Sequence, residues 1–369
     1  MLGRIYFFAS FGNLKEVPIG GGQTSARRLK DTLIRAGFNV LPTNRHRPKS
    51  QSGITRKLEI LFWAFVDPII FALKLLCHSR NNSLVLFIGY SGSMLPMETA
   101  IGMIAKLLGY KVVFYLKGGG AKLLYEKGSR LYRWTFRKTL KLYSLVMVEG
   151  EENGQMINQI SSTTTFYLPN YAEDGFAPKE LPCKDKDTVR IVYFGRIHKD
   201  KNILFIIEVF EKLCEKANNI VLSIIGTGAG DYSQSVSQRI DLSPYKDRIY
   251  RMEKQSHDGL KGILKEQHIF IFPSVEKREG HSNSLNEAMA WGVVPVVSNN
   301  NFLPSIVNDD SLVSISLDIQ SYVKIIEKLI NDKSLLRQKS EQVFKRVKIN
   351  YTQTVIVERL IKEIGKILG

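Results

Sequence analysis

The 369-residue sequence holds few cysteines, and their placement indicates neither a disulfide framework nor a zinc site. Cys77, Cys183 and Cys214 lie far apart, and no pair of them has Cys-x-x-Cys spacing. Isolated cysteines of this kind favour a reducing compartment. No other group of His, Cys, Asp and Glu residues has the spacing of metal ligands, so we expect no metal in the protein.

The sequence also lacks a long uncharged apolar run. The nearest candidate for a membrane span, residues 58–77, contains Glu59, Asp67, Pro68 and Lys74, which argues against spanning. The first residues have only a short apolar run and no small-residue cleavage site, so they predict a strand and not a signal peptide. We find no internal repeat with a period of about 20–50 residues and no low-complexity tract.

Acidic residues are scarce in the first half of the chain. Residues 1–172 carry 23 Lys and Arg against 9 Asp and Glu, a net charge of +14, whereas residues 173–369 carry 29 against 26, a net charge of +3. A basic half beside a nearly neutral half indicates an anionic partner, either nucleic acid or an anionic membrane leaflet. A basic surface that meets only solvent is the alternative.

The basic half contains an apolar segment with cations beside it. Residues 43–57 are polar and basic and predict a loop, and residues 58–77 predict a helix directly after it. This helix fits a membrane surface, or the core of the domain with Pro68 kinking or splitting it, or both with one face on each.

A second basic and aromatic helix is predicted over residues 129–143. We expect its Leu131, Trp134 and Leu142 to face the core. Its cations would form one band that suits an anionic surface. The band consists of Arg130, Arg133, Arg137, Lys138 and Lys141.

Short apolar runs alternate with helical periodicity along both halves. The strands are predicted at 4–10, 38–42, 83–89, 111–116, 146–149, 189–194, 221–225, 248–252, 270–272 and 293–297. This order predicts an α/β protein with two doubly wound parallel sheets. The expected parts are an N-terminal Rossmann-like domain over 1–172, a linker over 173–187, a C-terminal Rossmann-like domain over 188–350, and a terminal helix within 351–369.

Residues 270–298 predict a strand, a polar loop, a helix and a second strand. Ser284 and Glu287 have the spacing of a capping box, so we expect the helix to begin at Ser284. Glu279 then lies at the carboxyl end of a strand, where open α/β sheets bind ligands. A helix N-terminus suits a phosphate and a glutamate suits hydroxyl groups, which together describe a nucleotide sugar. Two ordinary surface acids are the alternative.

A glycine and two cations follow the first strand of the second half. Gly195 and Arg196 come directly after the strand, and Lys201 precedes the next helix. The planar arginine fork and the mobile lysine ammonium together suit a diphosphate. The next strand of the second half ends in Gly226 and Gly228.

Three consecutive glycines, Gly20, Gly21 and Gly22, come before a helix that we expect to begin at Ser25. Glycines let a backbone approach a ligand closely, so a loop at a binding site is one interpretation. A flexible loop without a ligand is the other.

The pattern of the second half resembles a known family. Glu279 and Glu287 form a Glu-x7-Glu pattern, with Gly280 after the first and Glu-Ala-Met-Ala-x-Gly starting at the second. This resembles the retaining glycosyltransferases of family 4 and is similar to bacterial enzymes of capsule, O-antigen and exopolysaccharide synthesis. The resemblance covers nearly all of 188–300 and the first half mainly in pattern. It implies the GT-B fold, with two Rossmann-like domains facing each other across a cleft and a terminal helix that crosses back to the first.

The resemblance also implies roles for single residues. Arg196 and Lys201 would hold the donor diphosphate, and Glu287 would bind the ribose hydroxyls. Glu279 would bind the hydroxyls of the donor sugar; the alternative, a nucleophile in a double displacement, fits the family less well than front-face attack. The other residues expected at the donor are Gly195, Gly226, Gly228, Gly280, His281, Ser282, Asn283 and Ser284.

On the acceptor side the sequence departs from the family. Many members carry a histidine where Lys117 stands here, and no histidine is near it. Lys117 would bind a phosphate or be a solvated lysine at a loop edge. With Gly118 and the glycines at 20–22, it makes up the expected acceptor side of the cleft.

We therefore predict a retaining, metal-independent glycosyltransferase that needs no cofactor and takes a nucleotide diphosphate sugar as co-substrate. Two fixed cations would replace a metal ion at the leaving diphosphate. The expected acceptor is a glycan on a lipid carrier, in cell-surface polysaccharide biosynthesis. The basic half predicts an anionic membrane surface as partner and a place on the cytoplasmic face of the inner membrane. No nucleic-acid module accompanies the charge, so we expect no nucleic acid.

Three alternatives remain at this point. A GT-B sugar-nucleotide epimerase or phosphorylase would use the same donor site, and product analysis with and without an acceptor would separate it. A non-catalytic protein would bind the nucleotide sugar without turnover. A nucleic-acid binder would keep tight, salt-dependent binding in Glu279→Ala and Arg196→Ala variants.

Overall fold

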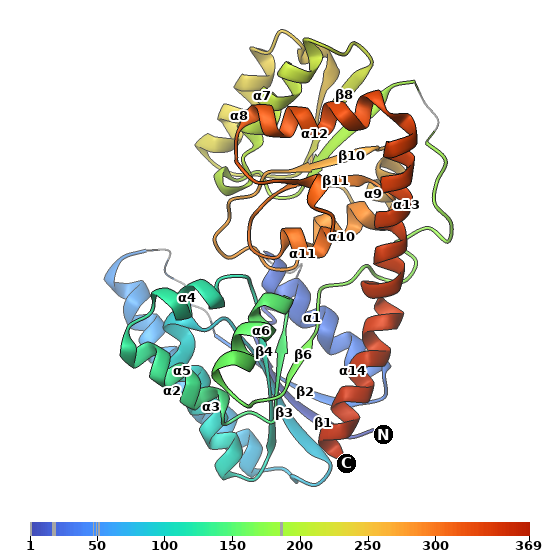
Figure 1. The fold of residues 1–369 in the computed structure, drawn as a ribbon. Helices are drawn as coiled ribbons and strands as arrows, with labels where there is room; N and C mark the ends of the chain where they lie inside the picture. The colour runs from blue at the N-terminus through green and yellow to red at the C-terminus, as the bar shows by residue number, and fades with distance from the viewer. Residues whose placement is uncertain (1, 17–19, 47, 49, 51, 185–186) are drawn as a thin grey trace. The chain divides into compact units, whose positions relative to one another are not determined.

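The protein consists of two compact α/β units. The computed structural model describes residues 2–16, 20–46, 48, 50, 52–184 and 187–369. The first unit comprises Met1–Pro169 and Val357–Gly369, and the second comprises Asn170–Ile356. Each unit is built on its own six-stranded sheet (Figure 1), and every strand pairing is parallel. The predicted pair of doubly wound parallel sheets is thus confirmed.

The sheet of the first unit has the strand order β2-β1-β3-β4-β5-β6. Its strands are β1 (Arg4–Ala9), β2 (Asn39–Asn44), β3 (Ser83–Gly89), β4 (Lys111–Leu116), β5 (Leu145–Val148) and β6 (Thr165–Tyr167). Its helices are α1 (Gly20–Arg35), α2 (Gly53–Leu76), α3 (Leu95–Leu107), α4 (Ala121–Lys127), α5 (Arg130–Leu140) and α6 (Glu151–Ile160). All seven residues of β3 are buried, as expected of a central parallel strand covered on both faces.

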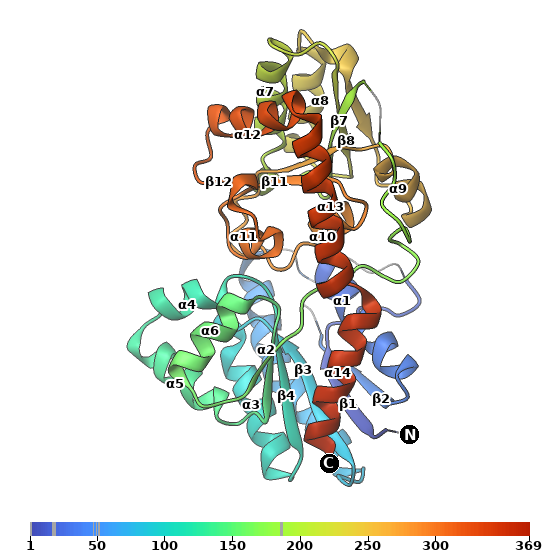
Figure 2. The ribbon, with the colours of Figure 1, turned by 45° about the vertical axis from the view of Figure 1, so that its right-hand side comes forward.

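Alternate residues of the central strands build the main core of the first unit. Tyr6 and Phe8 of β1 and Phe114 of β4 point to the same face. There they meet Phe71 of α2 and Phe136 of α5, together with residues of α3 and α6. Figures 1 and 2 both show α1 and the end of the chain on the other side of this sheet. The sheet of the first unit therefore lies between two layers of helices.

Three expectations for the first unit were wrong. Gly20, Gly21 and Gly22 form the first turn of α1, which begins five residues before Ser25. Glycine has a low helix propensity, so the local pattern placed the start of the helix after the three glycines. Helix α2 begins at Gly53, so residues 53–57 of the basic loop expected over 43–57 are helical. Residues 47, 49 and 51 of that loop lie outside the described residues. The helix continues through Pro68, which excludes the alternative of a helix split there.

The third wrong expectation concerns the orientation of α5. Leu131 and Trp134 are exposed and not in the core, and Leu142 is half-buried. The buried face instead carries Phe136 and Leu140, four residues apart. Apolar residues occur on both faces of this helix, so periodicity alone did not identify the core-facing one.

The sheet of the second unit has the strand order β12-β11-β10-β7-β8-β9. Its strands are β7 (Val189–Phe194), β8 (Ile220–Ile225), β9 (Ile249–Met252), β10 (Ile269–Phe272), β11 (Val294–Ser298) and β12 (Val313–Ser314). Its helices are α7 (Ile203–Cys214), α8 (Asp231–Asp241), α9 (His257–Leu264), α10 (Asn283–Ala290), α11 (Leu303–Val307), α12 (Ile319–Asn331) and α13 (Lys333–Asn350). From β7 the chain continues to β8 and β9 on one side of the sheet, and from β10 it continues to β11 and β12 on the other side. The loops that follow β7 and β10 at their carboxyl ends therefore form the crevice in which such sheets bind ligands.

Two segments beyond these sheets complete the chain. Residues 173–187, expected as a linker, are counted with the second unit, and residues 185–186 among them lie outside the described residues. Phe176 is buried in that unit, and Lys184 Nζ donates to the Trp291 carbonyl at 2.8 Å. The last helix, α14 (Gln353–Leu368), belongs to the first unit from Val357 onward.

Candidate donor site

A buried lysine lies at the centre of a polar network between the loops after β7 and β10. Lys201 Nζ forms an ion pair with Glu279 Oε2 and lies 2.7 Å from Glu276 Oε2. Ser274 Oγ donates to Glu279 Oε2 at 2.5 Å. The lysine is 6% exposed and Glu279 is 8% exposed, so this pair is largely shielded from solvent. The structure thus brings together two residues that the sequence assigned to one site.

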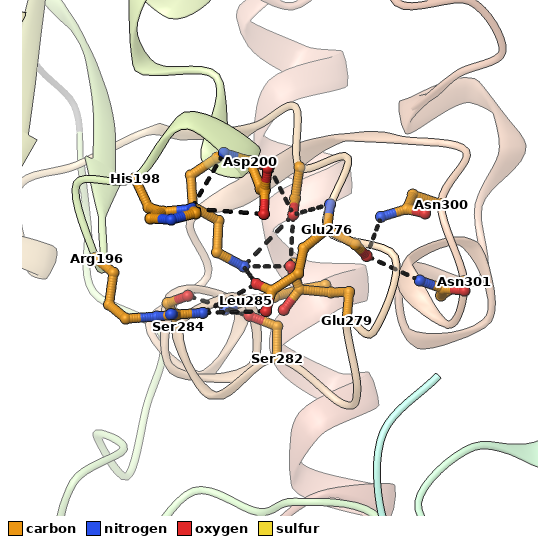
Figure 3. A network of polar contacts seen from close by, with 12 residues as sticks. Arg196, His198, Asp200, Glu276, Glu279, Ser282, Ser284, Leu285, Asn300 and Asn301 are labelled. Carbon is orange, nitrogen blue, oxygen red and sulfur yellow. Dashed lines mark hydrogen bonds and ion pairs between the residues drawn. The ribbon is translucent and has the colours of Figure 1, made fainter. Parts of the chain in front are cut away.

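The second predicted cation, Arg196, joins the same network through Glu276 (Figure 3). Its Nη2 atom donates to Glu276 Oε1 at 3.2 Å and to Oε2 at 3.0 Å. The Arg196 side chain is 63% exposed, in contrast to Lys201. The Tyr193 hydroxyl donates to the Arg196 carbonyl at 2.7 Å and so fixes the backbone of Arg196. Burial, with the nearby Glu279 carboxylate, raises the pKa of Tyr193, so this phenol stays neutral and a donor.

Asn202 explains how the chain turns from Lys201 into α7. It adopts a left-handed conformation with φ of 54°, which asparagine tolerates better than most residues. Its Nδ2 donates to the Pro273 carbonyl at 2.8 Å, which ties the loop after β7 to the loop after β10. Val275 N–H donates to the Asp200 carbonyl at 2.9 Å and fastens the same two loops again. The lysine is therefore held in place from both sides.

The helix that follows the acidic loop begins earlier than expected. Its N-cap is Ser282, whose Oγ accepts from Leu285 N at 3.3 Å, so the expected start at Ser284 was wrong. Several consecutive residues here can cap a helix, and the sequence does not distinguish among them. Ser284 Oγ lies 4.0 Å from where a Cβ on Gly195 would stand, so the N-terminus of α10 adjoins the end of β7. Its N–H groups and positive dipole end suit an anion there.

The remaining predicted residues of this stretch lie around the start of α10. His281 is buried, its ring meets Tyr351 edge-on at 4.8 Å, and its carbonyl accepts from Asn170 Nδ2 at 2.6 Å. Asn283 is the first residue of the helix, and Glu287 follows one turn later, half-buried. Gly280 links Glu279 to this helix. The residues expected at the donor thus lie at the carboxyl ends of the strands of one sheet.

The predicted glycines bring two loops into close contact. A Cβ on Gly226 would stand 1.8 Å from the Gly195 carbonyl oxygen, and one on Gly228 would stand 2.5 Å from the Ile197 carbonyl oxygen. Gly226 also has a φ of 148°, which L side chains rarely adopt. These glycines therefore let the ends of β7 and β8 touch, and a larger residue would push the Arg196 loop outward.

On the first unit, Lys117 is neither a solvated lysine nor a free cation. It is 5% exposed, and its Nζ lies 2.7 Å from Glu149 Oε1. The other oxygen of Glu149 accepts from Gly118 N at 2.7 Å, and Asn153 Nδ2 donates to the Gly118 carbonyl at 3.1 Å. Burial lowers the pKa of Lys117, although Glu149 acts in the opposite direction. The interpretation as a solvated lysine was therefore wrong, because the partner of Lys117 lies 32 residues away, whereas its role on the acceptor side stays a prediction.

Metal clusters and membrane-spanning helices are both absent from the part of the chain that the structure describes. Its residues contain no group of three or more His, Cys, Asp and Glu side chains placed to hold a metal ion. Among the same residues, no helix combines the length and the hydropathy that crossing a membrane requires.

Comparison with known proteins gives the class of fold first. The chain superposes on the sucrose-phosphate synthase of Thermosynechococcus elongatus with a TM-score of 0.75 at 14% identity, covering 98% of both chains. It superposes on HepE of Anabaena, solved in complex with UDP, with a TM-score of 0.73 at 11% identity, covering 99% of this chain and 100% of that one. The fold is GT-B, as predicted.

Sequence comparison adds a family match in the second half of the chain. Residues 179–346 match the family model of the glycosyl transferases group 1, which confirms the predicted resemblance to glycosyltransferases. The capsular polysaccharide biosynthesis glycosyltransferase CapM of Staphylococcus aureus is 30% identical over 177 residues, covering 47% of this chain and 45% of CapM. A phosphatidylinositol N-acetylglucosaminyltransferase subunit of Arabidopsis thaliana is 22% identical over 259 residues, covering 70% of this chain and 56% of that protein. The matches thus span about half the length of these relatives.

The sequence did not single out two members of the network, Ser274 and Glu276. Glu276 lies three residues before Glu279, and nothing in the local pattern marks it. Burial raises the pKa of Glu276, but the hydrogen bonds and charges of Lys201 and Arg196 outweigh this and lower the pKa below its usual value. Glu276 is therefore ionised at neutral pH and bridges both predicted cations.

Proposed function

We propose that the protein is a retaining glycosyltransferase that moves a sugar from a nucleotide diphosphate sugar to a glycan acceptor on a lipid carrier. The observation that carries this proposal is the pair of cations, Arg196 and Lys201, beside Glu279 and the N-terminus of α10. Cations and helix N–H groups suit a diphosphate, and a carboxylate suits sugar hydroxyls. All four features lie at the carboxyl ends of β7 and β10.

In this proposal the two cations and the α10 N–H groups stabilise the charge that develops on the leaving diphosphate. Removing one such donor typically raises the barrier by about 2.7–4 kcal/mol. Glu279 binds hydroxyls of the donor sugar and Glu287 binds the ribose. The leaving phosphate accepts the proton of the attacking hydroxyl on the same face of the sugar. The cations perform the role that a metal ion has in other transferases, so we propose that no metal is required.

Relatives support the proposed acceptor. CapM is named for capsular polysaccharide biosynthesis, and two relatives are named as subunits of phosphatidylinositol N-acetylglucosaminyltransferases. Those names describe a cell-surface polysaccharide in one case and a membrane lipid in the other. A glycan on a lipid carrier, made at the cytoplasmic face of the inner membrane, combines both features.

The exposed face of α2 supports contact with an anionic membrane. Asp67, Pro68, Phe71 and Leu75 form its buried face. The opposite face carries apolar residues that recur at helical spacing. Those more than half exposed are Ile54, Leu58, Leu61, Phe62, Phe65, Ile69, Leu73 and Leu76. One face on the core and one apolar face outward is the arrangement of a helix that lies in a membrane interface.

Helix α5 presents the cations that such a contact needs. Leu131 and Trp134 are exposed on it, and most of the basic band is exposed beside them. Tryptophan with flanking cations is typical of the headgroup region, where lysine and arginine add about 1 kcal/mol each on an anionic surface.

The proposal can be tested by thermal shift against UDP-, GDP-, ADP- and CMP-linked sugars. A ligand at about 100 times its dissociation constant should stabilise the protein by roughly 2.7 kcal/mol. We expect one nucleotide class to respond and the response to be lost in Lys201→Ala and in Arg196→Gln. Because Arg196 is largely exposed, its variant should fold even if Lys201→Ala does not.

A matched control is Arg337→Gln, which removes an exposed arginine that pairs with Glu341 on α13. It should leave the response unchanged. If the folded wild-type protein responds to no member of the panel, or responds equally with Arg196→Gln, the proposed donor site is wrong.

A further inference from the structure

The two cations of the proposed donor site share one carboxylate. Glu276 Oε2 lies 3.0 Å from Arg196 Nη2 and 2.7 Å from Lys201 Nζ. A single oxygen therefore bridges both groups that the proposal assigns to the diphosphate. An anionic oxygen between an arginine and a lysine is also what a bound phosphate would supply.

The backbone of Glu276 is fixed, whereas its side chain is accessible. Its carbonyl accepts from Asn300 Nδ2 and Asn301 Nδ2, each at 3.1 Å (Figure 3). It also accepts from Glu279 N at 2.9 Å. Its side chain is 27% exposed, in contrast to the 10% of Glu279. Rotation about side-chain bonds alone can thus release the cations without moving the loop.

The charges of the network already balance. Arg196 and Lys201 supply two positive charges, and Glu276 and Glu279 supply two negative ones. A diphosphate that entered this neutral network would place its charges against Glu276 at close range, which is unfavourable. The Glu279 side chain is the more buried of the two, so Glu276 is the carboxylate that can turn toward solvent.

We propose that the Glu276 carboxylate is an internal competitor for the phosphate position, which holds Arg196 and Lys201 until a donor diphosphate displaces it. This inference rests on the proposed function, because it takes the two cations as the diphosphate site. It also gives the carboxylate a part in turnover. When the sugar has left, Glu276 can return to the cations and speed release of the diphosphate product.

The expected change in affinity follows from the fraction of time for which the Glu276 pair is formed. If the Glu276 pair is formed about nine-tenths of the time, the apparent affinity for any competing anion falls about tenfold. Glu276→Gln keeps the shape of the side chain and removes its charge. We therefore expect Glu276→Gln to bind inorganic pyrophosphate about tenfold more tightly than the wild-type chain, measured by titration calorimetry at one fixed ionic strength. The nucleoside diphosphate of the responding class should gain the same factor in affinity, and stopped-flow measurements should show this gain as slower dissociation, because no carboxylate returns to displace it.

Two variants separate the effect of Glu276 from a general effect of net charge and from effects that do not involve the two cations. Glu215→Gln removes the same charge from an exposed glutamate that pairs with Lys212 at 2.7 Å, at the far end of α7. That end lies roughly 18 Å along the helix from Ile203, so its effect on pyrophosphate should be negligible. In the double variant Glu276→Gln/Arg196→Gln, most of the gain should disappear, because one of the released cations is gone.

The direction in which Glu276→Gln changes the affinity for pyrophosphate tests the inference. If Glu276→Gln binds pyrophosphate no better than wild type, or worse, the carboxylate positions the cations and does not compete with the ligand, and the inference is overturned. If the nucleotide panel still responds and depends on Arg196, that result leaves the proposed function intact. If neither protein binds pyrophosphate or any nucleotide, the proposed function fails together with the inference.

Discussion

Lys117 and Glu149 form a buried ion pair that joins the ends of β4 and β5, with 2.7 Å between Nζ and Oε1. The pair also fixes the backbone, because Glu149 accepts from Gly118 N. We expect Lys117→Met to lower the free energy of unfolding by about 3–5 kcal/mol, since it leaves a buried carboxylate without its cation. Urea denaturation of the purified chain measures this loss.

The double variant Lys117→Met/Glu149→Gln separates a paired charge from a general packing defect. The glutamine still accepts from Gly118 N but carries no charge, so most of the lost stability should return. Additive losses in the double-mutant cycle would show that the two residues do not act as a pair.

Gly226 tests how tightly the donor loops are packed. We expect Gly226→Ala to destabilise the second unit by more than about 1 kcal/mol, because the added Cβ meets the Gly195 carbonyl and the φ is unfavourable. Nucleotide-dependent thermal stabilisation should fall with it. The matched control is Gly262→Ala on α9, where a Cβ meets nothing within 4 Å. There alanine should stabilise the helix by up to about 1 kcal/mol, and equal effects at both glycines would contradict our account.

The sequence of this protein predicts features that are adjacent in the chain and misses those that packing brings together. Strand β7 and the residues after it were predicted because a buried strand and its glycine and cations are adjacent in the chain. The pairings of Lys117 with Glu149 and of Lys201 with Glu276 were not, because these glutamates lie 32 and 75 residues away and ion pairing has no sequence period. The face of α5 was assigned wrongly because Trp134 resembles a core residue but lies on the exposed side. Local sequence patterns thus predict the helices and strands, whereas the environment of each charged side chain depends on packing between distant parts of the chain.

Glu98 on α3 should make stability depend on pH. It is 1% exposed, and burial raises its pKa to about 7, although the N–H groups of Tyr90 and Ser91 favour the charged form. The folded chain therefore holds this proton more tightly than the unfolded chain. The stabilisation is complete below pH 4.5 and is lost as the pH rises through about 7. By the linkage relation the loss amounts to about 3 kcal/mol.

Glu98→Gln should remove this dependence. The variant keeps an oxygen for Tyr90 N and Ser91 N but cannot ionise, so its urea midpoint should change less than that of wild type between pH 5 and pH 8.5. Glu126→Gln, an exposed acid of α4, is the control and should keep the wild-type profile. An unchanged slope in Glu98→Gln would mean that another group titrates in this range.

The exposed face of α2 gives a prediction about membranes. Phe65 is 74% exposed at the middle of that face, so Phe65→Glu should leave the melting temperature nearly unchanged. If α2 lies in the interface, this change removes about 2 kcal/mol of apolar burial and weakens vesicle binding more than tenfold. Flotation with phosphatidylglycerol-containing vesicles at low salt measures the effect.

Leu242→Glu is the matched control, because Leu242 is 80% exposed at the end of α8 in the second unit. It adds the same charge at an equally exposed apolar residue, and its vesicle binding should equal that of wild type. Equal loss in both variants would assign the effect to net charge, and no loss in Phe65→Glu would remove α2 as the contact. Binding that is the same for neutral and anionic vesicles would exclude the basic band of α5, since attraction of lysine and arginine to the surface depends on anionic lipid.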